Sequence, residues 1–88
     1  MVHSVDLLEE AIELANQIGF EVRHEWLDGS RGGTCRIGDR KLLFVDLSLT
    51  AAEQLEQVTG ALKHPDCREA IQSLGAGAPS NPLLSLLD

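Results

Sequence analysis

The sequence predicts an α+β fold in which helices cover one face of a small sheet. Two observations predict the helices: apolar residues recur at helical spacing near the start of the chain and again after residue 50. A third predicts the sheet, because apolar and polar residues alternate between these segments as they do in half-buried strands. We expect the order αβββαα: an N-terminal helix, a three-stranded antiparallel meander, a long helix and a short helix.

The first helix is expected over residues 5–18. Ser4 precedes it as a residue that can cap a helix. Gly19 follows it, at the place where a left-handed residue often ends a helix. Two adjacent apolar stripes give this segment a wide apolar face: Val5, Leu8, Ile12 and Ala15, and Leu7, Ala11, Leu14 and Ile18.

Three strands are expected over residues 20–27, 34–37 and 40–47. The first alternates in the sequence FEVRHEWL, with Phe20, Val22, His24 and Trp26 on one face. The second and third are joined by Gly38-Asp39, a sequence typical of a tight hairpin turn.

The third strand is apolar on both faces. Leu42 and Phe44 share one face, whereas Leu43, Val45 and Leu47 share the other. A strand of this kind is normally covered on both sides. We therefore expect it to lie centrally, or to be covered by a helix or by a second chain.

A capping box, formed by Thr50 and Glu53, predicts the start of a long helix over Thr50–Lys63. Pro65 ends it, and a short helix is expected over 66–74. These elements place a single domain at residues 1–75. Residues 76–88 are expected to be a Gly/Ala/Pro linker and a leucine-rich tail, which packs either on its own core or on another chain.

Composition excludes several classes of protein. The 88 residues are enough for one domain, and the formal net charge of −7 opposes nucleic-acid binding. No window of eighteen residues is apolar, so we expect no membrane span, and the early acidic residues lead us to expect no signal peptide. Two cysteines in such a chain are typical of a reduced, cytoplasmic protein.

A metal site is one interpretation of the histidines and cysteines. His64 and Cys67 are separated by two residues, a spacing at which both can reach one zinc ion, with Cys35 and His24 as further ligands. Cys67 also belongs to the apolar stripe of its helix, which favours a buried structural thiol. No other cofactor is expected, and no residue is assigned a catalytic role.

A polar cluster on the sheet is a second candidate site. Asp46 interrupts an apolar run and needs a partner, for which Arg36 across the hairpin is the expected residue. With His24, these side chains would form an enzyme or small-ligand site if the strand register brought them to one cleft.

The stretch from Gly32 to Leu62 carries the pattern GGxCRI followed by LFVDxSLTxxEQL. It resembles a family of short bacterial proteins without assigned function, over about a third of the chain, and this resemblance implies no catalytic residues. The same stretch is also similar to the strand-and-helix segment of ImmA/IrrE-type metallopeptidases. The corresponding helix, Thr50–Lys63, lacks His-Glu-x-x-His, so any relation would be to a degenerate form without catalytic residues.

The leading functional hypothesis is a non-enzymatic interaction module that self-associates, as a homodimer, or that binds another protein. It depends on the third strand and the leucine tail, which supply the expected interface residues Leu42, Phe44, Leu83, Leu84, Leu86 and Leu87. The alternatives are a metal-binding or thiol-based domain that uses Cys35, His64 and Cys67, and a degenerate relative of a zinc peptidase.

Overall fold

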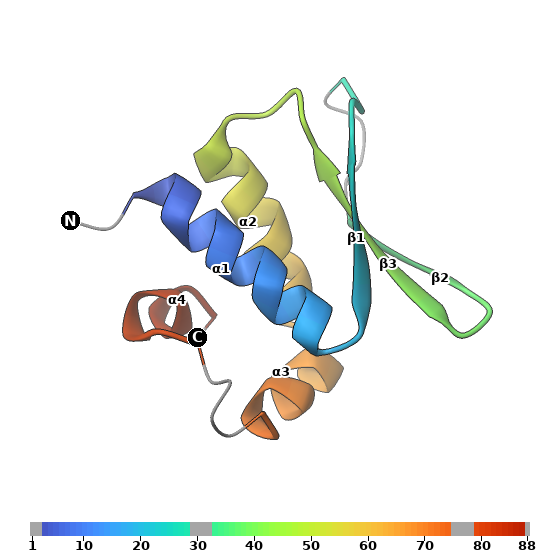
Figure 1. The fold of residues 1–88 in the computed structure, drawn as a ribbon, viewed down its shortest axis with the longest axis vertical. Coiled ribbons are helices and arrows are strands. Elements are labelled where there is room, and N and C mark those ends of the chain that lie inside the picture. Colours follow the sequence, from blue (N-terminus) through green and yellow to red (C-terminus); the bar gives the residue numbers. More distant parts are fainter. Residues whose placement is uncertain (1–2, 29–32, 75–78, 88) are drawn as a thin grey trace.

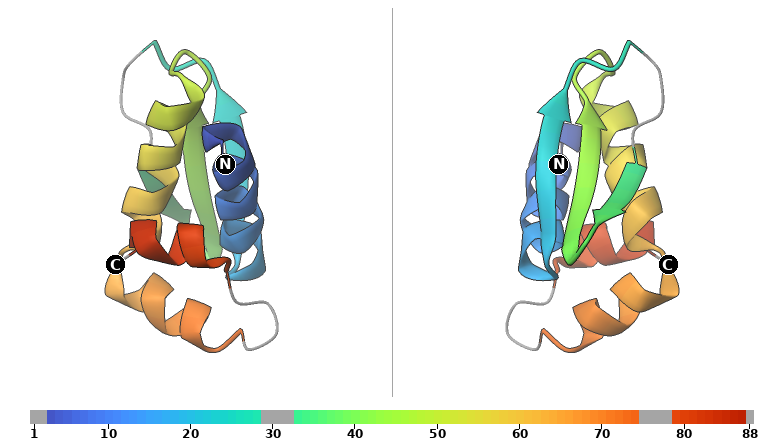
Figure 2. Two further views of the ribbon diagram at one scale, coloured as in Figure 1. Left: turned by 90° about the vertical axis from the view of Figure 1, so that its left-hand side faces the viewer. Right: turned by 90° about the vertical axis from the view of Figure 1, so that its right-hand side faces the viewer.

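A computed structural model describes residues 3–28, 33–74 and 79–87. It confirms the α+β class: Figure 1 shows two long helices side by side against one face of a three-stranded sheet, and Figure 2 shows the opposite face without a helix. The elements are α1 (Ser4–Gln17), β1 (Phe20–Glu25), β2 (Gly33–Ile37), β3 (Arg40–Asp46), α2 (Ala51–Leu62), α3 (Pro65–Gln72) and α4 (Asn81–Leu87).

The sheet has the strand order β1-β3-β2, so the predicted antiparallel meander is wrong in this detail. Strand β2 pairs antiparallel with β3, as the hairpin turn predicts, but β1 pairs with β3 in parallel. The apolar content of the strands explains the order. β3 is apolar on both faces and gains most from two neighbours, whereas four of the five residues of β2 are exposed, which suits an edge strand.

The central position of β3 confirms that part of the prediction. Leu43 and Val45 are fully buried on the side that α1 and α2 cover. Leu42 and Phe44 lie on the opposite side, flanked by β1 and β2. The first strand is shorter than predicted, and Trp26 beyond its end is 71% exposed.

The helix ends follow local sequence signals with one exception. His3, not Ser4, is the N-cap of α1, and no side chain caps it. Gly19 adopts φ +100° after the helix, as predicted for a residue without a β-carbon. At α2 the capping box is confirmed: the Glu53 N–H donates to Thr50 Oγ1 at 3.2 Å, and the Thr50 N–H donates to Glu53 Oε1 at 3.1 Å. The hydrogen bonds that the Thr50 N–H and the Thr50 hydroxyl donate to the Glu53 carboxylate hold the pKa of Glu53 below its usual value.

The leucine tail folds back onto its own chain. In α4, Leu83 and Leu87 join the core formed with α1, α2 and the sheet. Glu10 of α1 holds the start of this helix, because its carboxylate accepts hydrogen bonds from the Ser80 N–H at 2.8 Å and the Ser80 hydroxyl at 2.6 Å. Leu83 and Leu87 therefore stabilise the fold itself.

In the part of the chain that the structure describes, no helix combines the length and the apolar character needed to cross a bilayer.

Gly60 offers a test of the helix assignment, because it lies exposed inside α2 and a β-carbon there would meet no atom within 4 Å. We expect Gly60→Ala to raise the free energy of unfolding by up to about 1 kcal/mol, measured by urea denaturation, because alanine loses less backbone freedom in a helix. Gly19→Ala is the control and should lower stability, since its positive φ is unfavourable for alanine. A loss of stability in Gly60→Ala would contradict the structure at α2.

Candidate functional site

None of the described helices covers the second side of the sheet (Figure 2, right). The strand register sets its composition, because directly opposed residues of neighbouring strands share a face. Leu42 lies between Glu21 and Cys35, and Phe44 lies opposite Arg23. We call this surface the open face and define it by the residues Glu21, Arg23, Glu25, Cys35, Ile37, Arg40, Leu42 and Phe44.

The open face has an apolar centre that extends to a sheet edge. Leu42 is only 4% exposed because its neighbours cover it, and Phe44 is half-buried. On the edge strand β2, Cys35 is exposed and Ile37 is 55% exposed. The accessible apolar surface of the open face therefore consists of the half-buried Phe44 on β3 and the exposed Cys35 and Ile37 on β2.

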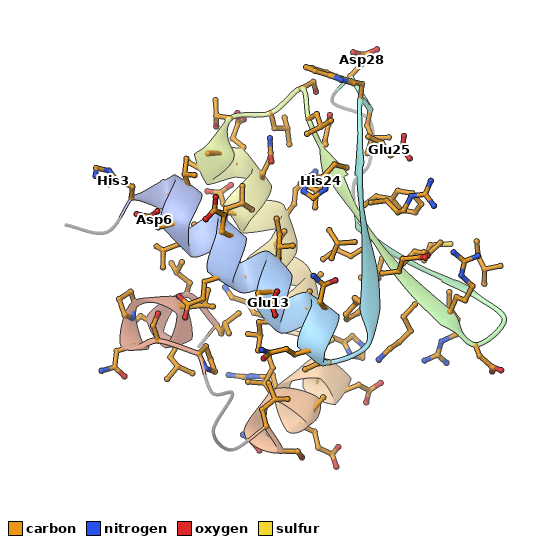
Figure 3. All side chains as sticks on the ribbon, viewed as in Figure 1. His3, Asp6, Glu13, His24, Glu25 and Asp28 are labelled. Carbon is orange, nitrogen blue, oxygen red and sulfur yellow. The ribbon has the colours of Figure 1, made fainter. Side chains whose placement is uncertain are left out.

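Charged side chains beside this centre form two ion pairs. Arg40 pairs with Glu21 across β3 and β1, and Arg23 pairs with Glu25 along β1 at 3.5 Å. The four charges of these pairs cancel, so the accessible charge of the open face is zero on a chain of formal charge −7. Asp46, which is opposite Glu25, is fully buried. Part of the excess acid lies on α1, where Figure 3 labels Asp6 and Glu13.

The six predicted interface residues divide into three groups. Leu42 and Phe44 lie on the open face, but Leu42 is 4% exposed, so of these two residues only the half-buried Phe44 is accessible to a partner. Leu83 and Leu87 are 0% and 6% exposed inside the core, so they are not accessible to a partner. Leu84 and Leu86 are exposed on α4, which packs against α1 and α2 on the other side of the sheet.

The predicted polar cluster is not assembled. Arg36 lies opposite Lys41, five residues before Asp46 on β3, which corresponds to about 16 Å along a strand. His24 lies opposite Val45 on the helix-covered side, and Figure 3 shows His24 and Glu25 pointing to opposite sides of β1. The expected ion pair between Arg36 and Asp46 is therefore absent from the described residues.

The carboxylate of Asp46 accepts hydrogen bonds from neighbouring segments of the chain and does not pair with Arg36. It is fully buried, and its Oδ1 accepts hydrogen bonds from the Leu27 N–H, the Ser48 N–H and the Ser48 hydroxyl. These bonds join the segment that follows β1 to the turn that follows β3. Its backbone N–H also donates to Gln57 Oε1 of α2 at 3.2 Å. Asp46 thus connects three parts of the fold.

Three of the four predicted metal ligands line one pocket between β2, α2 and α3: Cys35, His64 and Cys67. His24 lies outside it, at the other end of the sheet. Among the described residues, no group of three or more His, Cys, Asp or Glu side chains is arranged so that it could hold a metal ion. Burial raises the pKa of the Cys67 thiol, which keeps it protonated at neutral pH.

The same pocket contains a cation that sequence reasoning missed. Lys41 lies half-buried in its lining, beside Arg36 on the neighbouring strand. The available signal was the spacing of the two residues around the Gly38-Asp39 turn, because hairpin pairing brings them to the same face.

Comparison of the chain with protein-family models, with curated protein sequences and with solved structures finds no match.

Proposed function

We propose that this chain is a non-enzymatic interaction module that self-associates, with its open face packed against the open face of a second copy. The observation that carries the proposal is the combination of an apolar centre and paired, opposite charges on the sheet face that none of the described helices covers. Such a dimer would have two central sheets and two outer layers of helices, with the sheets about 10 Å apart.

Electrostatics favours this surface over others on the molecule. Two copies of a chain with charge −7 repel each other, and contact through acidic surfaces such as that of α1 adds local repulsion. Contact through the open face adds no such local repulsion, because its accessible charges cancel. A two-fold axis through it can bring Arg23 or Arg40 of one copy towards Glu21 or Glu25 of the other, so the surface is complementary to itself.

Burial gives a second argument. An 88-residue chain has a small core, and its net stability is correspondingly low. Covering Phe44 and Ile37 would remove apolar area from water and stabilise both copies. Self-association would therefore add to the stability that the helices and β3 already provide.

A charge introduced at Ile37 tests the proposal. We expect the wild-type chain to form dimers in sedimentation equilibrium between micromolar and millimolar concentration. Ile37→Glu should weaken the dimer by about tenfold or more, since it places a charge in an apolar contact. Val5→Glu on α1 is the matched control, because Val5 is 53% exposed and Ile37 is 55% exposed. This control should dimerise as the wild type does.

Two further measurements keep the test decisive if the Ile37→Glu variant fails to fold. Arg23→Glu gives the open face a net negative charge and should also weaken the dimer. Alkylation of Cys35 should become slower as the concentration of the wild-type chain rises, because the partner covers it. A wild-type chain that stays monomeric throughout, or equal dimerisation of Ile37→Glu and Val5→Glu, would overturn the proposal.

A further inference from the structure

The pocket between β2, α2 and α3 has the size of a small-molecule site. Its volume is about 380 Å³, within the range of about 300 to 1,000 Å³ that such sites usually have. It opens on the helix-covered side of the hairpin, where Figure 2 shows β2 beside α2. Of the open-face residues, Cys35 alone also lines this pocket, whereas Arg36 and Lys41 line it from the other side of the sheet.

Two cations of the hairpin line this pocket without a carboxylate partner. Arg36 and Lys41 are opposed residues of β2 and β3, and neither forms an ion pair among the described residues. On the open face, by contrast, Arg23 and Arg40 are both paired with glutamates. In a chain with twice as many acidic as basic residues, two adjacent cations that face a cavity can serve an anion from outside.

The ammonium of Lys41 is held in place by contacts within the chain, but it keeps N–H donors that a ligand can use. Its Nζ donates to the Ile18 carbonyl oxygen at 3.3 Å and lies 5.0 Å from the centre of the Phe20 ring. An ammonium carries three N–H donors, so this carbonyl bond leaves others for a ligand. The half-buried position of Lys41 strengthens its attraction for an anion relative to a fully hydrated lysine.

His64 adds a donor at the start of α3. Its Nδ1 accepts a hydrogen bond from the Asp66 N–H at 3.3 Å, so in the neutral ring the proton is on Nε2. Asp66 opposes an anion, but its side chain is 91% exposed and its charge is screened by water. The described lining carries two cations, the exposed Arg36 and the half-buried Lys41, against this one carboxylate, so its formal net charge is positive.

The rest of the lining is largely apolar. Phe20, Ile18, Ala61 and Ala70 contribute carbon surface. Cys67, whose burial raises its pKa, contributes a neutral thiol and no negative charge. A ligand that fits this lining combines an anionic group with an apolar body.

We propose that this pocket binds a small carboxylate with an apolar body. The carboxylate lies between the guanidinium of Arg36, whose planar N–H groups match a carboxylate, and the ammonium of Lys41. The apolar body lies against Phe20 and Ala61. This site is independent of self-association, because the two cations lie on the opposite side of the sheet from Ile37 and Phe44.

Octanoate is the probe for calorimetric titration of the full chain. We expect saturable binding with one site per chain, and weaker binding of 1-octanol, which has the same chain length without the charge. Arg36→Gln should lower the affinity for octanoate by about tenfold or more, because it removes a charged hydrogen bond. Arg23→Gln is the matched control, since this exposed arginine lies on the open face of the same sheet, and it should bind octanoate as the wild type does.

The location of binding gives a second readout. On addition of octanoate, the largest amide chemical-shift changes should occur at residues that line the pocket, such as Arg36, Ala61 and Ala70. Absence of saturable binding, equal affinity for octanol, equal loss in Arg36→Gln and Arg23→Gln, or shift changes centred on the open face would each overturn the proposal. Failure of the dimer test would leave these expectations unchanged.

Discussion

Asp46→Ala should lower the free energy of unfolding by about 3 kcal/mol, because three hydrogen bonds to a buried carboxyl group are lost together. The Oδ1 atom accepts from the Leu27 N–H at 3.1 Å, from the Ser48 N–H at 2.9 Å and from the Ser48 hydroxyl at 2.7 Å. Alanine supplies no acceptor, so two backbone N–H groups would lose their partner in a partly buried region. The segment after β1 and the turn after β3 would also lose their connection.

Guanidinium unfolding followed by circular dichroism measures this change. Asp46→Asn is the control, since it preserves the shape and one oxygen acceptor, and it should lose less than half as much stability. If Asp46 were exposed at the surface, both substitutions would change the free energy of unfolding by less than about 0.5 kcal/mol. That result would contradict the buried position of this side chain.

Leu83→Ala should lower the free energy of unfolding by about 2–5 kcal/mol, because it leaves a cavity in a closed core. Leu83 is 0% exposed on α4, which packs against α1 and α2. The loss should be the same at all protein concentrations, since the packing is within one chain.

Leu84→Ala on the same helix is the matched control. Leu84 is 40% exposed, and its truncation should cost less than about 1 kcal/mol in the same denaturation experiment. Equal losses at the two positions would mean that α4 does not dock through Leu83. A loss at Leu83 that disappears at high protein concentration would indicate docking on another chain.

Much of the secondary structure could be predicted from local signals. The apolar stripes predicted α1 to within a residue at each end, and the Thr50–Glu53 pair predicted the start of α2. Both signals act within a few residues, through helical spacing and side-chain caps, so tertiary contacts are not needed to recognise them. The end of β1 was predicted less well, because a run of alternating residues does not show where pairing stops.

The candidate sites could be predicted only in part. The two-sided apolar pattern around Phe44 indicated a strand that lies centrally or is covered by a helix or a second chain, and the structure places it centrally, with Leu42 and Phe44 on the side opposite the helices. The charge balance of that surface depends on the pairing of Glu21 with Arg40, which follows from the parallel alignment of β1 with β3. No spacing in the sequence gives that alignment, because the two strands are separated by β2.

By itself the sequence determined six of the seven helices and strands that the structure describes, which faces are apolar and that the chain is strongly acidic, since each of these follows from residue type and periodicity. It did not predict α4, because the segment was expected as a leucine-rich tail. Only the tertiary structure decided that β1 runs parallel to β3, that Leu83 and Leu87 lie in their own core, and that Arg36 and Lys41 share a pocket. The physical reason is that these features depend on contacts between residues far apart in the chain. Such contacts form only when the whole set of apolar faces is buried together.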